Sequence, residues 1–175
     1  KLGDIPLVGW SLHAATKYEG FDKIVVSTDN NVIADYVRQF AAMSGDERIE
    51  CVGRPRHLTD GLSYPIQNVV LNYLNTCKQN YYTVSLFQPT SPFIDQWQIE
   101  ECMLNITKGG VASAYTIAKV KHNDHWLNQR NLVDGMTAFA FGEERKQIYN
   151  KQQKEASYKF GNFVVARTKA IRNGF

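Results

Sequence analysis

The sequence has few cysteines, no long apolar run and no block of charge of one sign. Its three cysteines, Cys51, Cys77 and Cys102, are odd in number and widely spaced, without the pairing of a disulfide framework or a metal site. No apolar stretch approaches the roughly 20 residues that cross a bilayer, and the first residues lack the charged-then-apolar order of a secretion signal. We therefore expect a soluble protein of a reducing compartment, the cytoplasm.

The charged residues give little indication of a macromolecular partner. The 20 basic and 17 acidic residues are interspersed and leave a formal net charge of +3. A nucleic-acid arm or a membrane-binding segment would show clustered basic charge, so we expect neither partner. The spacing of His122 and His125 is not that of a helical metal pair.

Apolar residues recur at helical or strand spacing along most of the chain. Helical spacing predicts helices over residues 7–18, from Asp29 or Asn30 to Gly45, over 66–74, from Asp95 to Gly109, and onward from Thr168. Short β-branched runs predict strands over 23–27, 49–52, 82–87, 111–118 and 163–166, and a weaker one over 137–141.

Strands that alternate with helices are typical of parallel βαβ units. We therefore predict an α/β fold, a three-layer α/β/α sandwich with a mostly parallel sheet, formed by residues 1–175 as a single domain. In such sheets ligands bind beyond the carboxyl ends of the strands, so the loops after Ser27, Val52 and Phe87 should share one edge. In the last of these loops two prolines frame Thr90 and Ser91 and reduce the entropy cost of presenting polar groups there.

Four segments carry a resemblance to a known family. They are residues 4–11, residues 21–29, Arg54-Pro55 with Leu58 and Asp60, and residues 86–92; a looser match covers 158–166. Together they resemble the CMP-sialic acid synthetases, or acylneuraminate cytidylyltransferases. The resemblance implies a nucleotide-diphospho-sugar transferase fold and an enzyme that joins CTP to an acidic nine-carbon sugar, a sialic acid or other nonulosonic acid, with release of pyrophosphate. It also implies Mg²⁺ as a cofactor and a homodimer. Residues 122–149, rich in charge and aromatics, would form the contact segment of the dimer or, equally, a surface segment without a partner.

The resemblance further implies roles for single residues. Nucleotide-binding roles fall on Arg54, Asp60 and Ser63, and sugar-binding roles on Gln88, Thr90, Ser91, Lys159, Asn162 and Phe175. At Lys159 the family often has an arginine near the sugar carboxylate; lysine attracts a carboxylate but cannot form the two-pronged contact of arginine.

The residue types alone leave other interpretations open. Thr90 and Ser91 can cap the next helix or satisfy loop backbone groups. Arg54 can form an ordinary surface ion pair, and Asp29 can cap a helix instead of facing a ligand.

The sequence also departs from the family pattern. The family's glycine- and lysine-containing phosphate loop and its metal-binding aspartates have no counterpart in these residues, so we assign no catalytic residue and no metal ligand, and we expect activity only as part of a longer chain. Ile94 stands where the family has an arginine. Two alternatives therefore remain: a cytidylyltransferase for an eight-carbon ulosonic acid, and a catalytically silent relative that acts as a binding module.

Overall fold

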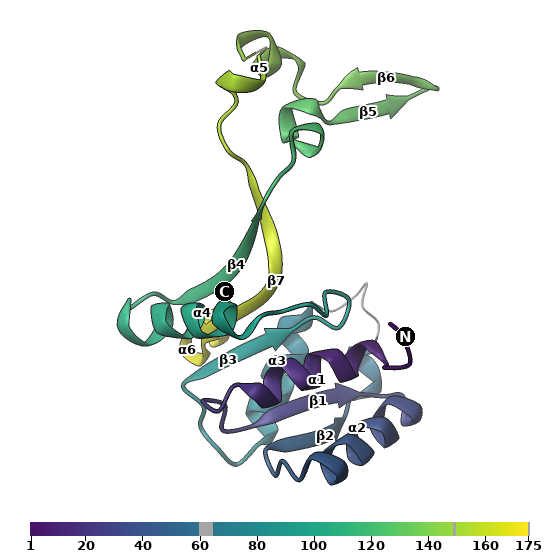
Figure 1. The fold of residues 1–175 in the computed structure, drawn as a ribbon, viewed down its shortest axis with the longest axis vertical. Coiled ribbons are helices and arrows are strands. Elements are labelled where there is room, and N and C mark those ends of the chain that lie inside the picture. Colours follow the sequence, from purple (N-terminus) through teal and green to yellow (C-terminus); the bar gives the residue numbers. More distant parts are fainter. Residues whose placement is uncertain (60–64, 149, 175) are drawn as a thin grey trace. The chain divides into compact units, whose positions relative to one another are not determined.

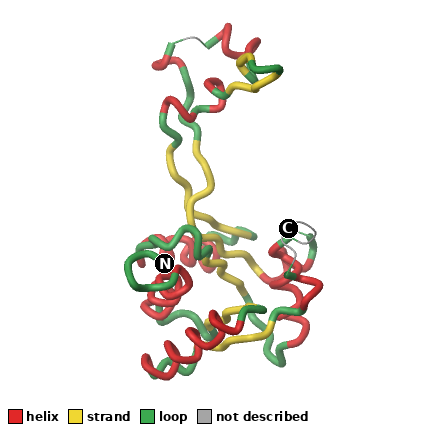
Figure 2. Tube along the Cα trace, turned by 90° about the vertical axis from the view of Figure 1, so that its right-hand side faces the viewer, coloured by secondary structure: helices red, strands yellow, loops and turns green. Residues whose placement is uncertain are grey.

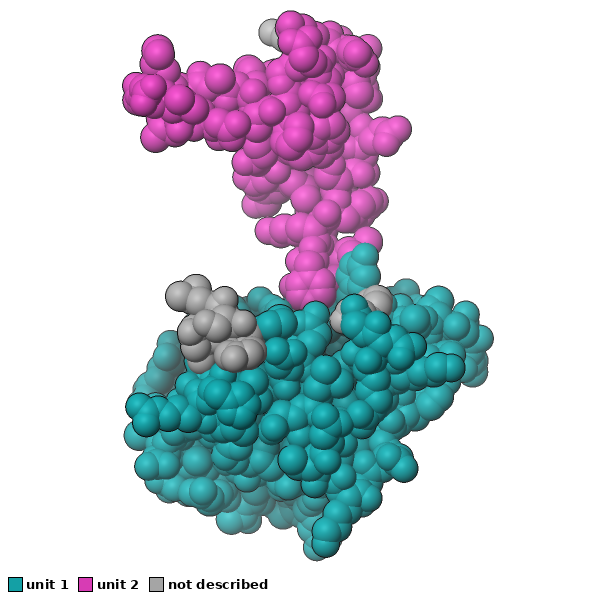
Figure 3. Space-filling model, turned by 180° about the vertical axis from the view of Figure 1, so that it is seen from behind, with its two compact units in different colours: residues 1–115, 162–175 teal, residues 116–161 magenta. Residues whose placement is uncertain are grey.

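The computed structural model describes residues 1–59, 65–148 and 150–174, and the chain divides into two compact units. Unit 1 comprises residues 1–115 and 162–175, and unit 2 comprises residues 116–161 (Figure 3). The predicted contact segment 122–149 falls within unit 2. No helix among the described residues has the length and apolar character needed to cross a membrane.

The first half of unit 1 alternates helices with parallel strands. Its elements are α1 (Leu7–Lys17), β1 (Ile24–Thr28), α2 (Asn31–Ser44) and β2 (Ile49–Gly53). β1 and β2 pair in parallel from Ile24–Ile49 to Thr28–Gly53, so their carboxyl ends lie side by side. Gly45 ends α2 in the left-handed region, at a φ of 65° that glycine adopts without strain.

The second half of unit 1 contributes a mixed sheet. Its elements are η1 (Arg56–Leu58), α3 (Ile66–Thr76), β3 (Thr83–Phe87), α4 (Gln96–Lys108), β4 (Ser113–Lys119), β7 (Tyr158–Arg167) and α6 (Thr168–Arg172). The strand order is β3-β7-β4, and β3 pairs with β7 in antiparallel fashion. β4 and β7 run side by side and lead into and out of unit 2 (Figures 1 and 2).

Unit 2 is built from short elements. They are η2 (His122–Asp124), η3 (Trp126–Asn128), β5 (Arg130–Val133), β6 (Met136–Phe139), α5 (Gly142–Gln147) and η4 (Lys151–Gln153). β6 confirms the weak strand predicted over 137–141, whereas β5 and α5 were not predicted. Every residue of β5 is exposed, so the strand carries no apolar alternation. Asp134 and Gly135, both at positive φ, form the hairpin turn that could have revealed it.

The α/β class is confirmed, and the sheet is more mixed than predicted. One described strand pair, β1–β2, is parallel, whereas β3–β7 and β5–β6 are antiparallel. β3 nevertheless points in the same direction as β1 and β2, with α1 in front of these strands and α3 behind them (Figure 1). The carboxyl ends of all three strands therefore lie at one edge of unit 1.

Two apolar clusters form the core of unit 1. One gathers α1, β1 and α2 around Leu12 and Val37, and the other packs α4 against β7 around Ile99 and Phe163. Phe87 packs against both clusters, so the last residue of β3 joins the two halves of the core.

Gly161 allows β4 and β7 to approach closely. A Cβ atom at this position would lie 2.8 Å from the carbonyl oxygen of Thr116, nearer than carbon and oxygen atoms can approach. The residues that begin and end unit 2 are therefore direct neighbours.

Arg48 connects the end of α1 with the loop before β2 through one side chain. Its guanidinium donates to the carbonyl oxygens of Thr16 and Tyr18, each at 2.8 Å, at the end of α1. It also forms an ion pair of 2.7 Å with Asp46, and the two side chains are 25% and 14% exposed. Arg48 thus satisfies carbonyl groups that the helix end leaves without backbone partners.

We predict that Arg48→Ala lowers the free energy of unfolding by about 2–3 kcal/mol, because it removes charge-assisted hydrogen bonds and leaves partly buried carbonyls unsatisfied. Arg38→Ala, which removes an exposed ion pair with Asp35, should cost less than about 0.5 kcal/mol. Urea unfolding of the two variants measures the difference, and equal losses would contradict the connecting role of Arg48.

The hydrogen bond from Arg48 lowers the pKa of Asp46 below its ordinary value of 3.8. Because the folded-state pKa lies below the unfolded one, the ion pair stabilises the fold at neutral pH, and this contribution is lost as the pH falls through the lowered value. We expect the stability deficit of Asp46→Asn, measured by urea unfolding, to shrink on acidification below 3.8. A deficit that stays constant with pH would argue against this coupling.

Candidate functional site

The candidate site lies at the edge of unit 1 where β1, β2 and β3 end. Asp29 follows β1, Arg54 follows β2 and Gln88 follows β3. The sequence predicted that these loops share one edge, and the common strand direction brings them there (Figure 1).

Arg54 connects the ends of the two parallel strands. Its backbone N–H donates to the carbonyl oxygen of Thr28 at 2.9 Å, and its Nη2 donates to that of Ser27 at 2.8 Å. Among the described residues Arg54 forms no ion pair, so the surface salt bridge that its residue type also allowed is not found there. Its Nε is buried and has no hydrogen-bond partner among the described residues. This N–H of the cationic guanidinium can therefore donate to an oxygen atom of a ligand.

A cavity of about 340 Å³ opens between β1 and β3. Its lining includes Ser27 and Arg54 at the ends of β1 and β2, Phe87 and Pro89 at the end of β3, and mainly apolar side chains of α1 and α3. Gln88 lies between two lining residues but does not itself line the cavity. Arg54 and the two neighbours of Gln88 therefore line one cavity, although they are distant in the sequence.

A tight turn shapes the loop after β3. The N–H of Ser91 donates to the carbonyl oxygen of Gln88 at 2.9 Å. Within the described residues no hydrogen bond holds the side chains of Gln88, Thr90 or Ser91. A capping box of Asp95 and Gln98 begins α4, as the sequence predicted for Asp95, so Thr90 and Ser91 do not cap this helix. Three polar side chains at the loop therefore remain available to a ligand.

Asn162 holds the far end of the same loop. Its side-chain N–H donates to the carbonyl oxygen of Phe93, and it precedes Phe163, which pairs with Phe87 across β3 and β7. The resemblance implied a sugar-binding role for Asn162, which stays a prediction; in the structure its side chain contacts the backbone of the loop after β3. No local sequence pattern indicates a hydrogen bond between residues so far apart.

Asn30 rather than Asp29 caps α2. The Oδ1 atom of Asn30 accepts from the N–H groups of Val32 at 2.9 Å and Ile33 at 3.2 Å. The interpretation of Asp29 as a helix cap is therefore wrong, and its exposed carboxylate lies at the end of β1 without that structural role.

Tyr73 adds a neutral polar group to the cavity wall. Its hydroxyl donates to Glu50 at 3.2 Å. Burial, followed by the neighbouring Tyr81 and Glu50, raises the pKa of Tyr73. The hydroxyl therefore stays protonated at neutral pH and acts as a hydrogen-bond donor.

The structure does not test the remaining predicted site residues. Lys159 is exposed on the part of β7 that belongs to unit 2. Asp60, Ser63 and Phe175 lie outside the described residues. In residues 1–59, 65–148 and 150–174, no three His, Cys, Asp or Glu side chains are grouped as metal ligands.

Sequence comparisons identify relatives of this chain. It is 24% identical over 125 residues to an N-acylneuraminate cytidylyltransferase of Oncorhynchus mykiss, covering 71% of this chain and 27% of that protein. It is 27% identical over 100 residues to an N-acylneuraminate cytidylyltransferase of Escherichia coli O18:K1:H7, covering 57% and 22%. The chain thus spans about a quarter of the length of these curated relatives.

The structural comparison supports the fold independently. A 4-diphosphocytidyl-2C-methyl-D-erythritol synthase from Anaerococcus prevotii superposes with a TM-score of 0.65 at 13% identity, over 97% of this chain and 63% of that one. The family model described as cytidylyltransferase matches residues 1–170. The chain therefore belongs to the cytidylyltransferase family.

Proposed function

We propose that this protein transfers CMP from CTP to a sialic acid or related nonulosonic acid. The anomeric hydroxyl of the sugar attacks the α-phosphorus of CTP and loses its proton, and the bond to the β-phosphate breaks to release pyrophosphate. The observation that supports the proposal most is the shared cavity, which is lined both by Arg54 and by Phe87 and Pro89, the two neighbours of Gln88.

The chemistry of Arg54 and of the loop after β3 fits the two substrates. The buried Nε and the fixed guanidinium of Arg54 suit a carbonyl or phosphate oxygen of the nucleotide. The amide of Gln88 and the hydroxyls of Thr90 and Ser91 both donate and accept, as sugar hydroxyls and an N-acyl group require. The two named relatives, both N-acylneuraminate cytidylyltransferases, favour a nine-carbon over an eight-carbon acidic sugar.

Mg²⁺ remains part of the proposal for the complete protein, but no described cluster of His, Cys, Asp or Glu fits it, so we assign it no ligand here. We also propose a cytoplasmic location, since Cys51, Cys77 and Cys102 are free thiols, as is usual in a reducing compartment.

We expect Arg54→Ala to lower kcat/KM for CTP about tenfold to hundredfold, because it removes a charged hydrogen-bond donor from the cavity lining. Gln88→Ala should raise the KM of the sugar about threefold to tenfold, through the loss of neutral hydrogen bonds. Pyrophosphate release by the full-length protein, with CTP and a panel of nonulosonic and eight-carbon ulosonic acids, measures both effects.

Arg56→Ala is the matched control, because Arg56 is an exposed arginine two residues from Arg54 and does not line the cavity. Its kinetic constants should equal those of the unaltered protein. The site assignment is wrong if Arg54→Ala and Gln88→Ala also leave both constants unchanged. Turnover of an eight-carbon acid alone would contradict the proposed substrate.

We also propose that the protein is a homodimer and that the β5–β6 hairpin contributes to the interface. Leu132, Val133 and Met136 are 72%, 62% and 74% exposed, which leaves an apolar hairpin open to solvent. A second copy of the chain would cover these side chains and remove them from water.

The double substitution Leu132→Ser/Met136→Ser tests this interface. We expect it to weaken dimerisation at least tenfold, because each buried apolar side chain contributes about 1.5–3 kcal/mol. Sedimentation equilibrium of the full-length protein gives the dissociation constant. Val32→Ser, at an exposed apolar side chain of unit 1, should leave it unchanged, and an equal effect of both changes would refute the hairpin interface.

A further inference from the structure

Unit 2 carries the whole net charge of the chain. Residues 116–161 hold eight lysines and arginines against five aspartates and glutamates, whereas the other residues hold twelve of each. The excess of +3 is therefore confined to a unit that contributes no residue to the cavity described above.

Two cations of this unit meet at one neutral atom. The Oδ1 of Asn128, at the end of η3, accepts from Arg145 Nη1 at 2.5 Å and from Lys154 Nζ at 2.7 Å. The side-chain N–H of the same asparagine donates to the carbonyl oxygen of His122. An amide oxygen has no formal charge, so it holds the two cations together without neutralising their repulsion.

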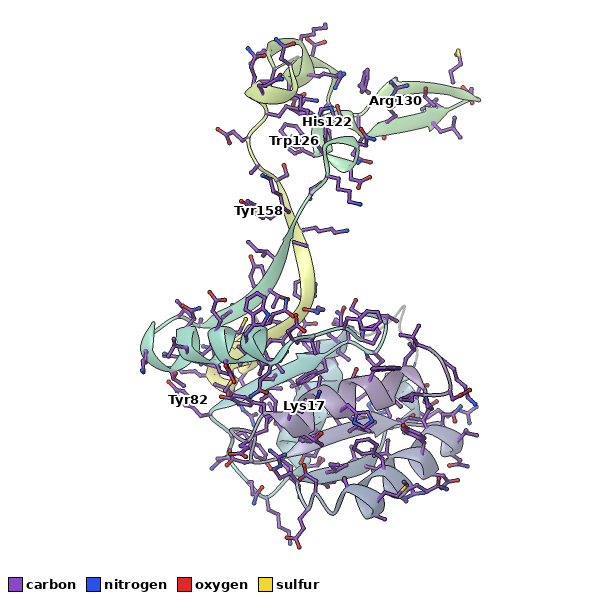
Figure 4. The ribbon with its side chains drawn as sticks, in the orientation of Figure 1. Lys17, Tyr82, His122, Trp126, Arg130 and Tyr158 are labelled. Carbon is purple, nitrogen blue, oxygen red and sulfur yellow. The ribbon has the colours of Figure 1, made fainter. Side chains whose placement is uncertain are left out.

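Further basic side chains lie near this pair. Desolvation, and after it the charges of Lys154 and Lys151, lower the pKa of His122, and desolvation followed by the charge of Arg145 lowers the pKa of Lys154. Neither Lys151 nor Lys154 forms an ion pair within the described residues. Figure 4 labels His122, Trp126 and Arg130 in this part of unit 2.

The cluster is held in place by neutral contacts. The guanidinium of Arg145 lies 4.1 Å from the ring centre of Phe139 and donates to the carbonyl oxygen of Leu127 at 3.3 Å. The buried ring of His125 accepts at Nδ1 from the N–H of Leu127, so its Nε2 carries the proton and donates to the carbonyl oxygen of Glu155 at 3.1 Å. This second bond ties the segment of Lys154 to η3, so the cations are positioned before any ligand arrives.

We propose that Arg145, Lys151, Lys154 and His122 form a binding site in unit 2 for a phosphate group, either free inorganic phosphate or the terminal phosphate of a phosphate monoester. Basic side chains from three separate segments converge here, which suits a tetrahedral dianion with several acceptor oxygens better than a planar carboxylate with two. An anion would compensate the repulsion that Asn128 leaves in place. The site is separate from the proposed nucleotide and sugar site, and its test requires no turnover.

The experiment is NMR titration of the histidine rings in the full-length protein, with the four ring signals assigned by His→Gln substitutions. Inorganic phosphate should raise the pKa of His122 in a saturable manner at concentrations up to about 10 mM, whereas sodium chloride at equal ionic strength should not. Lys154→Gln and Lys151→Gln should each weaken this response about tenfold. Lys146→Gln, which removes an exposed lysine paired with Glu143 on α5, should leave it unchanged.

Further arms of the titration distinguish the source of the phosphate. Saturation by both inorganic phosphate and glycerol phosphate supports recognition of a terminal phosphate group, and saturation by inorganic phosphate alone supports the free ion. The proposal is overturned by a response that chloride reproduces, by a response that saturates with acetate but not with phosphate, or by equal responses in Lys154→Gln and Lys146→Gln. Far-UV circular dichroism checks that each variant is folded.

Discussion

The packing of Phe87 is the contact on which the candidate site depends. Its ring centre lies 5.9 Å from that of Phe21 and 5.1 Å from that of Phe163, so it connects the core around α1 with the core around α4. The next residue in the chain is Gln88. The packing of Phe87 between these two clusters therefore fixes where the loop after β3 begins.

The polar groups of the site come from loops, but rigid elements fix where those loops begin. The parallel pairing of β1 with β2 places Arg54 against the end of β1, and the antiparallel pairing of β3 with β7 places Asn162 against the loop after β3. The cavity lies between these two pairs of strands. A change in either pairing would move one wall of the cavity relative to the other, even with every polar side chain retained.

Much of unit 1 could be predicted from the sequence because its elements are periodic and have clear end signals. Asp95, Gly45 and the β-branched residues of β1 fixed element ends to within a residue or two. The choice between Asp29 and Asn30 could not be made, because both residue types cap helices equally well and only the backbone path decides.

The rest of the structure depends on contacts that leave no local pattern. β5 is exposed on both faces, so neither face requires apolar residues and the sequence shows no alternation of apolar and polar residues. The bond from Asn162 to Phe93 and the shared acceptor at Asn128 join residues distant in the chain. Sequence motifs did indicate the polar residues at the strand ends, but not the apolar walls that α1 and α3 contribute to the cavity.

Thr116 and Gly161, the first and last residues of unit 2, approach each other closely on β4 and β7. This pair of strands is the stem from which unit 2 extends. Adjacent strands lie about 5 Å apart, so the polypeptide leaves and rejoins the stem at almost the same point. A segment of different length or composition can be grafted there while β3, β7 and the loop at Gln88 keep their register. Unit 2 can thus change in evolution without a change in the strands of unit 1.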